Sequence, residues 1–153
     1  MKIVGNGGHA KVVREVWALV GPFASEDAAF IAVGDNKDRK KEAEAYQQYN
    51  FPVLIHPSAV ISDAAHIGVG TVIMAGVVVQ ADAVIGDHCI LNSSCVVDHD
   101  CVLEDFVHIA PGAALCGNVH VGEGALIGVG VGIAPNTVIQ PWTVIKAHAL
   151  RSD

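Results

Sequence analysis

A six-residue register runs unbroken through residues 55–150 and constrains the fold more than any other feature of this chain. Every sixth position from Ile55 to Ile145 is aliphatic, sixteen residues in succession. Four positions after each of them stands a small or β-branched residue, such as Ala59 or Cys89. A hexapeptide repeat indicates a solenoid, because one unit cannot bury its apolar side alone and stacked units supply the core.

This repeat resembles that of the left-handed parallel β-helix, in which three hexads wind once around a triangular prism. Residues eighteen apart would then lie one above another, and the sixteen hexads would make a little over five coils. At a strand spacing of about 4.8 Å the prism would be about 25 Å tall. A sandwich of short strands is the alternative, but its irregular turns would break the register. A composition of 52% hydrophobic but only 5% aromatic residues also favours a narrow aliphatic interior.

The chain divides into two predicted domains, a small α/β unit over residues 1–54 and the β-helix over 55–153. No stretch of 18 or more residues is uniformly apolar, which disfavours a membrane span. The first residues predict a strand and a glycine turn rather than a secretion signal. We therefore expect a cytoplasmic protein.

Charge is divided unevenly between the two parts. Residues 1–54 hold seven basic and seven acidic residues, whereas 55–153 hold nine acidic residues against Lys146 and Arg151. No basic stripe is present, so the sequence disfavours binding to nucleic acid. The charged run from Lys37 to Glu44 is interpreted as a solvated helix face.

Three evenly spaced cysteines, Cys89, Cys95 and Cys101, could suggest a metal site or disulfides. All three occupy the small inward slot, at three different corners of the predicted prism. A disulfide needs Cα atoms within about 7 Å of each other, and the corners should lie farther apart. Packing of reduced thiols in the core is the preferred interpretation, and it fits a cytosolic protein.

The residue before each aliphatic row should point outward, yet it is often apolar. Exposed apolar area of this extent usually marks an interface, and flanks of this kind predict a homotrimer of prisms packed side by side. The residues in this outward slot are Val60, Val72, Val78, Val84, Ile90, Val96, Val102, Leu126, Val138, Val144 and Leu150.

The first 54 residues predict a truncated, Rossmann-like βαβαβ unit. We expect strands at 1–4, 29–33 and 51–55, the last feeding the first coil, and helices at 10–20 and 37–48. The first helix should turn Val12, Val13, Val16, Leu19 and Val20 inward.

The turn Gly5-Asn6-Gly7-Gly8-His9-Ala10 has the G-x-G-x-x-A form. Glycines allow a phosphate to approach the backbone closely, and the amino terminus of a helix attracts it. The pattern lacks an acidic ribose partner at the expected strand end. Two interpretations stay open: binding of a phosphate or nucleotide sugar, or a tight turn with a structural role alone.

One histidine is a candidate catalytic base. His99 lies outside the inward rows between Asp98 and Asp100, and Gly117 should lie directly over it. A carboxylate beside an imidazole can fix its tautomer and raise its basicity, as a general base requires. The absent side chain of Gly117 would leave room for a substrate atom. A solvated surface histidine is the alternative.

Two further polar residues are candidates for the site. His108 stands in the outward column of Val72 and Ile90, where it could contact a cofactor between subunits or have no ligand. Asn92 could orient a group near His99, or could simply be a turn amide.

Five segments resemble a family of bacterial sugar acetyltransferases that join a nucleotide-sugar-binding domain to a left-handed β-helix. This family includes UDP-4-amino-sugar N-acetyltransferases and sialic-acid O-acetyltransferases. The segments follow the order of the family and spread over almost the whole chain: GNGGHAK at 5–11, IAVGDN at 31–36, LIHPSAVIS at 54–62, LNSSCVVDHD at 91–100 and HIAPGAALCGNV at 108–119.

This resemblance implies that His99 is the general base and that Asp100 increases its basicity. It implies that His108 and Gly117 contact acetyl-CoA between neighbouring subunits of a trimer, with direct acetyl transfer and no metal. It further implies substrate contacts from four residues of the amino-terminal unit, which are Gly7, Gly8, His9 and Gly34.

The chain differs from the family in two regions. Family members usually carry an extra strand after the first helix, ending in an acidic pair that contacts the nucleotide, whereas this chain passes from Gly21-Pro22 almost directly to the IAVGDN strand. Family members also continue beyond the equivalent of Lys146, which is here the expected cation for a cofactor phosphate.

The leading hypothesis is therefore transfer of an acetyl group from acetyl-CoA to an amino group of a nucleotide-linked sugar, in glycan or polysaccharide biosynthesis. A second hypothesis is acetylation of a hydroxyl group, as on a sialic acid. A third hypothesis is a β-helix protein that binds its ligand without catalysing a reaction. A metal enzyme of the carbonic-anhydrase kind is disfavoured, because its His-x-x-x-x-His pair does not occur.

Overall fold

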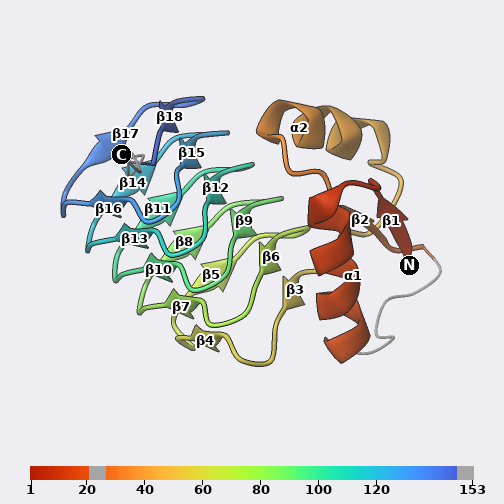
Figure 1. Cartoon of the computed structure of the whole chain (residues 1–153), viewed down its shortest axis with the longest axis horizontal. Helices are drawn as coiled ribbons and strands as arrows, with labels where there is room; N and C mark the ends of the chain where they lie inside the picture. Colours follow the sequence, from red (N-terminus) through yellow and green to blue (C-terminus); the bar gives the residue numbers. More distant parts are fainter. Residues whose placement is uncertain (21–26, 148–153) are drawn as a thin grey trace, which may run out of the picture.

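The computed structural model describes residues 1–20 and 27–147, and it consists of a parallel β-solenoid flanked by two helices (Figure 1). Pro22 and Leu150, which the sequence analysis placed in a connection and in the outward slot, lie outside the described residues. Sixteen two-residue strands form the solenoid, from β3 (Leu54–Ile55) to β18 (Val144–Ile145). The predicted coils are confirmed, because each strand pairs in parallel with the strand eighteen residues away.

Three sheets form the faces of the solenoid, and every third strand belongs to the same sheet. The first contains β4 (Val60–Ile61), β7 (Val78–Val79), β10 (Val96–Val97), β13 (Ala114–Leu115) and β16 (Gly132–Ile133). The second contains β5 (His66–Ile67), β8 (Val84–Ile85), β11 (Val102–Leu103), β14 (His120–Val121) and β17 (Val138–Ile139). The third contains β3, β6 (Val72–Ile73), β9 (Ile90–Leu91), β12 (His108–Ile109), β15 (Leu126–Ile127) and β18.

The interior is filled by the two inward rows that the register predicts. Ile73, Leu91, Ile109 and Ile127 are fully buried, as are the small residues between them. Burial decreases at the two ends, where Ile55 is exposed and Ile145 only half-buried. The stack therefore has a continuous aliphatic core, in which each coil covers the apolar edge of the next.

Each corner of the prism repeats one backbone device, a residue in the left-handed region of φ. At the corner between the first and second sheets these residues are Asp82, Asp100, Asn118 and Asn136, with φ of 59, 59, 59 and 59°. Asp and Asn tolerate this conformation better than other residues that carry side chains. Short polar side chains therefore line this corner.

The cysteines of the central coil are core residues, as predicted. Cys89, Cys95 and Cys101 are free and buried, and only Cys116 of the four is exposed. Burial raises the pKa of the Cys89 and Cys95 thiols to about 12, so both stay protonated at neutral pH.

The amino-terminal unit is smaller than the predicted βαβαβ arrangement. Strand β1 (Lys2–Val4) pairs in parallel with β2 (Ala29–Ile31), with α1 (Gly8–Val20) between them, and α2 (Asn36–Ala45) follows. The third predicted strand was assigned wrongly to this unit, because β3 pairs with β6 and belongs to the solenoid. A Rossmann-like sheet is thus not formed by residues 1–20 and 27–54.

The inward face of α1 was also only partly predicted. Val13 and Val16 are buried, but Val12 and Leu19 are exposed. The buried face of α1 packs on the third sheet and covers Val72 and Ile90. These two outward residues therefore lie beneath the chain's own helix rather than at a surface free for another subunit.

A buried arginine joins the two parts of the molecule. Arg39, in the run interpreted above as a solvated face, is only 1% exposed. Its Nε donates a hydrogen bond to the carbonyl of His88 at 2.8 Å and its Nη2 to that of Phe106 at 2.7 Å. The remaining bonds go to the carbonyls of Val33 and Gly34 and to Oδ1 of Asn36. The interpretation was wrong at this position because the corner residues His88 and Phe106 turn their carbonyls toward α2.

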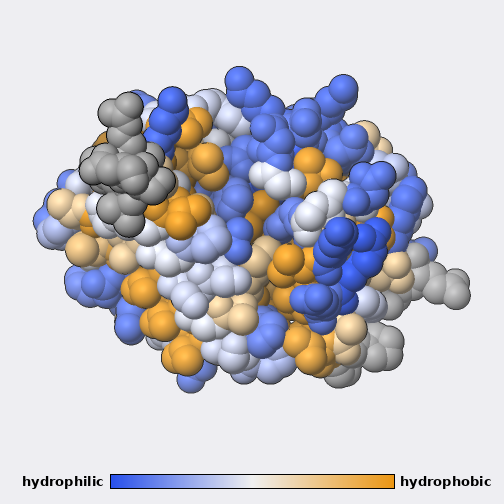
Figure 2. Space-filling view, viewed as in Figure 1, coloured by the Kyte–Doolittle hydropathy of each residue, from blue (hydrophilic) through white to orange (hydrophobic). Residues whose placement is uncertain are grey.

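Apolar side chains remain exposed on the other flanks of the solenoid. Val60 and Val138 are 64% and 63% exposed, and Val84 is exposed as well. Figure 2 shows hydrophobic residues over β4, β7 and β10 of the first sheet. The described residues contain no helix long and apolar enough to cross a membrane.

Candidate active site

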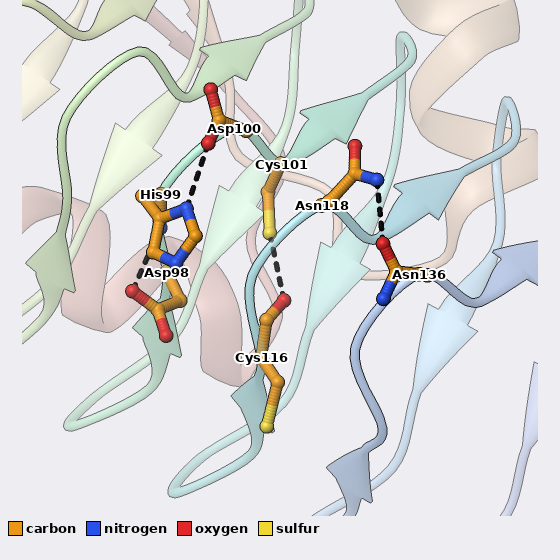
Figure 3. Close-up of polar contacts among 7 residues, drawn as sticks. All are labelled: Asp98, His99, Asp100, Cys101, Cys116, Asn118 and Asn136. Atoms are coloured by element: carbon orange, nitrogen blue, oxygen red, sulfur yellow. Dashed lines mark hydrogen bonds and ion pairs between the residues drawn. The ribbon is translucent and has the colours of Figure 1, made fainter.

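The corner between the first and second sheets presents an imidazole and a carboxylate in contact (Figure 3). His99 lies in the turn between β10 and β11, and its Nδ1 is 2.7 Å from Oδ2 of Asp100. Oδ1 of Asp98 accepts a hydrogen bond from the His99 amide at 2.8 Å. The His99 carbonyl in turn accepts one from the amide of Asn118 at 2.9 Å. The rigid coil thus holds the backbone of His99 on both sides.

The environment of His99 favours its protonated form. The hydrogen bond that Nδ1 donates to Asp100, and then the charge of Asp98, raise the pKa of the His99 imidazole above its ordinary value. Because Nδ1 donates to Asp100, the lone pair of the neutral ring is on Nε2. This tautomer suits a general base, and the side chain is 60% exposed and accessible to a substrate.

Gly117 lies directly over the His99 ring, as the eighteen-residue period predicts. A methyl group at this position would stand 2.5 Å from Cε1 and 2.6 Å from Nε2 of His99. A side chain larger than hydrogen would therefore displace the ring, so glycine is required for the imidazole to keep its position. The space beside Gly117 is thus occupied by the His99 ring and is not free for a substrate atom, as the sequence had suggested.

His108 and Asn92 form a second cluster on the third sheet. Nδ2 of Asn92 is 3.3 Å from Nε2 of His108, which places the proton of the neutral ring on Nδ1. Asn92 was expected to lie near His99. It stands instead at the corner between the third and first sheets and contacts His108. Burial, and then the positive charge of Arg39, lower the pKa of His108 to about 4.

His9 approaches His108 from the amino terminus of α1. Its pKa is also lowered to about 4, first by burial and then by the charge of Arg39. Nε2 of His9 is buried and has no hydrogen-bond partner within residues 1–20 and 27–147. The structure thus brings together a neutral imidazole from each part of the molecule.

The glycine turn borders a pocket of about 310 Å³ that also reaches His9 and Gly34. Gly5 is required by the fold, because a side chain there would stand 2.5 Å from the carbonyl oxygen of Ala32. Gly7 and Gly8 have no such contact, since a Cβ on either would meet nothing within 4 Å. Their lack of side chains leaves the amino terminus of α1 open, which favours the ligand-binding interpretation of the turn.

The two clusters lie on opposite sides of one chain. His99 stands at the corner between the first and second sheets, whereas His9 and His108 lie on the outer face of the third sheet. The prism separates them, so one chain alone does not combine its glycine pocket with its own His99.

Lys146 lies in the corner column of Asn92, three coils farther along the stack, and it is exposed. At about 4.8 Å per coil this corresponds to about 14 Å. It therefore stands apart from both clusters. Within the described residues, no group of three or more His, Cys, Asp and Glu side chains is placed to hold a metal ion.

The sequence analysis missed a second imidazole–carboxylate pair. Nε2 of His120 is 2.8 Å from Oε1 of Glu104, on the outer face of the second sheet. The signal that could have revealed it is the spacing of sixteen residues, which brings an outward side chain next to the corner residue of the coil below.

The lowered pKa values of His9 and His108, which are half-buried, make stability depend on pH, and the lowered pKa of the buried His88 acts in the same direction. The unfolded chain binds a proton on His9 and on His108 below pH 6.5, but the folded chain does so only near pH 4, so their contribution is complete above pH 6.5. As pH falls from 6.5 to 4, we expect each to remove about 3 kcal/mol from the free energy of unfolding. Urea unfolding at several pH values measures the slope of the free energy of unfolding against pH.

A glutamine at position 108 cannot be protonated, so His108→Gln should flatten the slope between pH 6.5 and 4. The matched control is His66→Gln, since His66 is an exposed residue of the second sheet. Equal slopes for the wild type and the His108 variant would contradict the assignment of a neutral imidazole.

The chain combines a hexapeptide solenoid, an imidazole–carboxylate pair at one corner and a glycine-lined pocket in the attached unit. This combination is typical of acyltransferases. The relatives of this chain are sugar acetyltransferases. The acetyltransferase domain of PglB from Neisseria gonorrhoeae FA1090, solved in complex with acetyl coenzyme A, is 35% identical and has a TM-score of 0.89. The match covers 95% of this chain and 87% of that one.

PerB from Caulobacter crescentus, solved in complex with CoA and GDP-perosamine, is 36% identical with a TM-score of 0.90, over 95% of this chain and 84% of that one. The UDP-N-acetylbacillosamine N-acetyltransferase of Bacillus subtilis (strain 168) is 41% identical over 47% of this chain. That match spans half the length of the curated relative. No protein-family model matches the chain. The chain belongs to the hexapeptide-repeat sugar acetyltransferases.

Proposed function

We propose that this protein transfers an acetyl group from acetyl-CoA to an amino group of a nucleotide-linked sugar. The observation that carries the proposal is the His99–Asp100 contact, which leaves the lone pair of a basic, exposed imidazole on Nε2 while the ring rests against Gly117. Related structures contain acetyl-CoA, or CoA together with GDP-perosamine, and these ligands are the substrate classes that we assign here.

In the proposed reaction the amine nitrogen attacks the thioester carbonyl, and a C–N bond forms. Nε2 of His99 accepts the proton that the nitrogen loses, and Asp100 stabilises the resulting imidazolium. The C–S bond then breaks, and the thiolate of CoA takes this proton as it leaves. The transfer that we propose is direct: the thiols of Cys89 and Cys95 are buried and protonated, and the exposed thiol of Cys116 forms no hydrogen bond to a base within the described residues.

We further propose a homotrimer, in which His99 of one subunit faces the glycine pocket of the next. Two observations support this arrangement: the clusters lie on opposite sides of one prism, and Val60 and Val138 expose apolar surface on flanks that the amino-terminal unit does not cover. One subunit would then supply His99 and Gly117 to the shared site. The next subunit would supply the glycine pocket and His108.

Several finer assignments complete the proposal. We place the enzyme in the cytoplasm, and we propose that its coils wind left-handed. The division into residues 1–54 and 55–153 is likewise proposed, with the shorter part derived from a Rossmann-like nucleotide-sugar domain that has kept the β1–α1–β2 unit.

The test is an acceptor panel with radiolabelled acetyl-CoA. It pairs UDP- and GDP-linked 4-amino sugars with the matching 4-hydroxy sugars and with a free sialic acid. Acetylation of amino acceptors alone supports the proposal. Acetylation of hydroxyl acceptors would establish the O-transfer alternative, and binding of acetyl-CoA without any transfer would indicate a protein that has lost catalysis.

Asp100→Asn should change the pH profile of the reaction. An amide keeps a hydrogen bond to Nδ1 but removes the negative charge, so the pKa of His99 should fall. The acidic limb of kcat/KM, which begins above pH 6.5 in the wild type, should move to lower pH, while the plateau decreases because the base is weaker. An unchanged acidic limb would show that His99 is not the group that titrates.

A further inference from the structure

A groove with an aromatic wall lies between the start of α2 and the last two coils of the solenoid. It measures about 270 Å³, less than the ~300–1,000 Å³ of a complete small-molecule site. It therefore suits one part of a larger ligand. Its lining from the solenoid is Gly124, Leu126, Trp142 and Val144, and its lining from the amino-terminal unit is Gly34, Asp35, Asn36 and Lys37, of which Asp35 is the one acidic residue.

The apolar floor of the groove continues a row that is covered elsewhere. Val72 and Ile90 of the third sheet are buried under α1, but Val144, two coils beyond His108, is 56% exposed. Leu126 is half-buried between them. The end of this sheet at β18 is thus open, and the start of α2 contributes Asn36 and Lys37 to the groove. Figure 1 shows α2 beside this end of the solenoid.

Trp142 is held in the groove by an unusual backbone. Its φ of 59° is rare for a bulky residue and is enforced by the corner of the last coil, where its amide donates to the carbonyl of Glu123 at 2.7 Å. Its six-membered ring rests on Gly124, which has no side chain to displace it. The indole is therefore fixed in position and half-exposed, as a stacking surface for a planar ring should be.

Positive charge adjoins this ring. A depression of about 400 Å³ on the other side of Trp142 is lined by Lys37, Lys40 and Lys41, with Glu44 as its acidic member. Lys40 is paired with Glu123, and its Nζ lies 5.6 Å from the centre of the Trp142 ring. Lys37 and Lys41 are exposed, and neither forms an ion pair within the described part of the chain.

We propose that this groove binds a nucleoside diphosphate, with the base stacked on Trp142 and a phosphate bound by Lys37. A planar ring joined to a dianion matches an aromatic wall with lysines beside it. Gly34 borders both this groove and the glycine pocket, so a ligand could extend from one into the other. The inference rests on the proposed function for its ligand class, and both a nucleotide sugar and CoA carry this chemistry.

The fluorescence of Trp142 tests the proposal directly. In a Trp17→Phe background Trp142 is the sole tryptophan, and titration with UDP, GDP or adenosine 3′,5′-bisphosphate should quench it. Trp142→Leu, followed by calorimetry, should weaken binding of the cognate nucleotide about tenfold or more, because stacking is lost. Trp142→Phe keeps an aromatic face and should retain most of the affinity. The nucleotide whose affinity depends on Trp142 identifies the source of the ligand.

Lysine variants test the second half of the site. Lys37→Gln should weaken binding several-fold, whereas Lys11→Gln should not, because Lys11 is exposed on α1 and borders neither the groove nor the lysine depression. Unchanged affinity in both the Trp142→Leu and Lys37→Gln variants would overturn the proposal. So would the absence of binding by any of the three nucleotides at millimolar concentration.

Activity measurements separate this inference from the proposed function. If acetyl transfer proceeds and Trp142→Leu changes neither substrate KM, the groove proposal fails while the transferase stands. If nucleotides bind through Trp142 but no acceptor is acetylated, the groove stands and the proposed reaction fails. A raised KM for one substrate at unchanged kcat supports both.

Discussion

Replacing His99 by alanine should lower kcat by about two to four orders of magnitude, the usual contribution of a general base. The physical reason is that Nε2 carries the lone pair of an exposed ring whose Nδ1 contacts Asp100, and a methyl group cannot accept the proton of the attacking amine. The KM values should change little, since the exposed imidazole contributes more to proton transfer than to binding. Steady-state rates with the acceptor identified by the panel measure the loss.

The fold should tolerate this change. His99 is exposed and its backbone bonds with Asp98 and Asn118 do not involve the ring, so the midpoint of thermal unfolding should stay the same. His66→Ala, at an exposed position of the second sheet, is the matched control and should keep wild-type turnover. If the His99 variant also turned over at the wild-type rate, the base would have to be sought elsewhere, with His120 and Glu104 as the other imidazole–carboxylate pair.

Replacing Arg39 by methionine should lower the free energy of unfolding by about 3–5 kcal/mol. Methionine fills a similar volume but leaves the carbonyls of His88 and Phe106 without their donor in a buried contact. For a chain of this size such a loss corresponds to a fall of roughly 10 °C in the thermal midpoint. Urea unfolding gives the free energy.

Two variants sharpen this test. Arg39→Lys should recover little of the free energy of unfolding that is lost in Arg39→Met. An ammonium group cannot reproduce the planar guanidinium, which donates to acceptors on both parts of the molecule. Arg14→Met removes an exposed arginine whose hydrogen bond to Gly5 is 3.2 Å long, and it should cost well under 1 kcal/mol. A loss in Arg39→Met no larger than in Arg14→Met would show that the guanidinium does not join the two parts.

The sequence was sufficient to predict the solenoid because one short-range rule repeats along it. The period of six fixed the inward rows, and the period of eighteen placed Gly117 over His99 and the three buried cysteines at different corners. The contact of His99 with Asp100 and the stacking of its ring on Gly117 therefore could be predicted from the spacing of the repeat.

Other features depend on how the amino-terminal unit docks, which no local pattern specifies. Arg39 was assigned to a solvated face because its neighbours are charged, and its carbonyl partners lie 49 and 67 residues away. The approach of His9 to His108 was missed for the same reason. The contact of Asn92 with His108 lies within the solenoid, at the same sixteen-residue spacing as that of Glu104 with His120, and the repeat could have predicted it. The strand at 54–55 was assigned to the wrong unit, since its partner is β6 of the solenoid, eighteen residues farther along the chain.

The stacking distance of eighteen residues also limits how such a protein can change in length. Adding one full coil between β9 and β10 would leave His99 on the same edge of the prism and merely raise it by one layer. Adding a single hexad would rotate everything beyond it by a third of a turn, carrying the imidazole onto another edge. Related proteins should therefore gain or lose whole coils on the amino-terminal side of the His99 corner. Insertions of other lengths should be tolerated only on its carboxyl-terminal side.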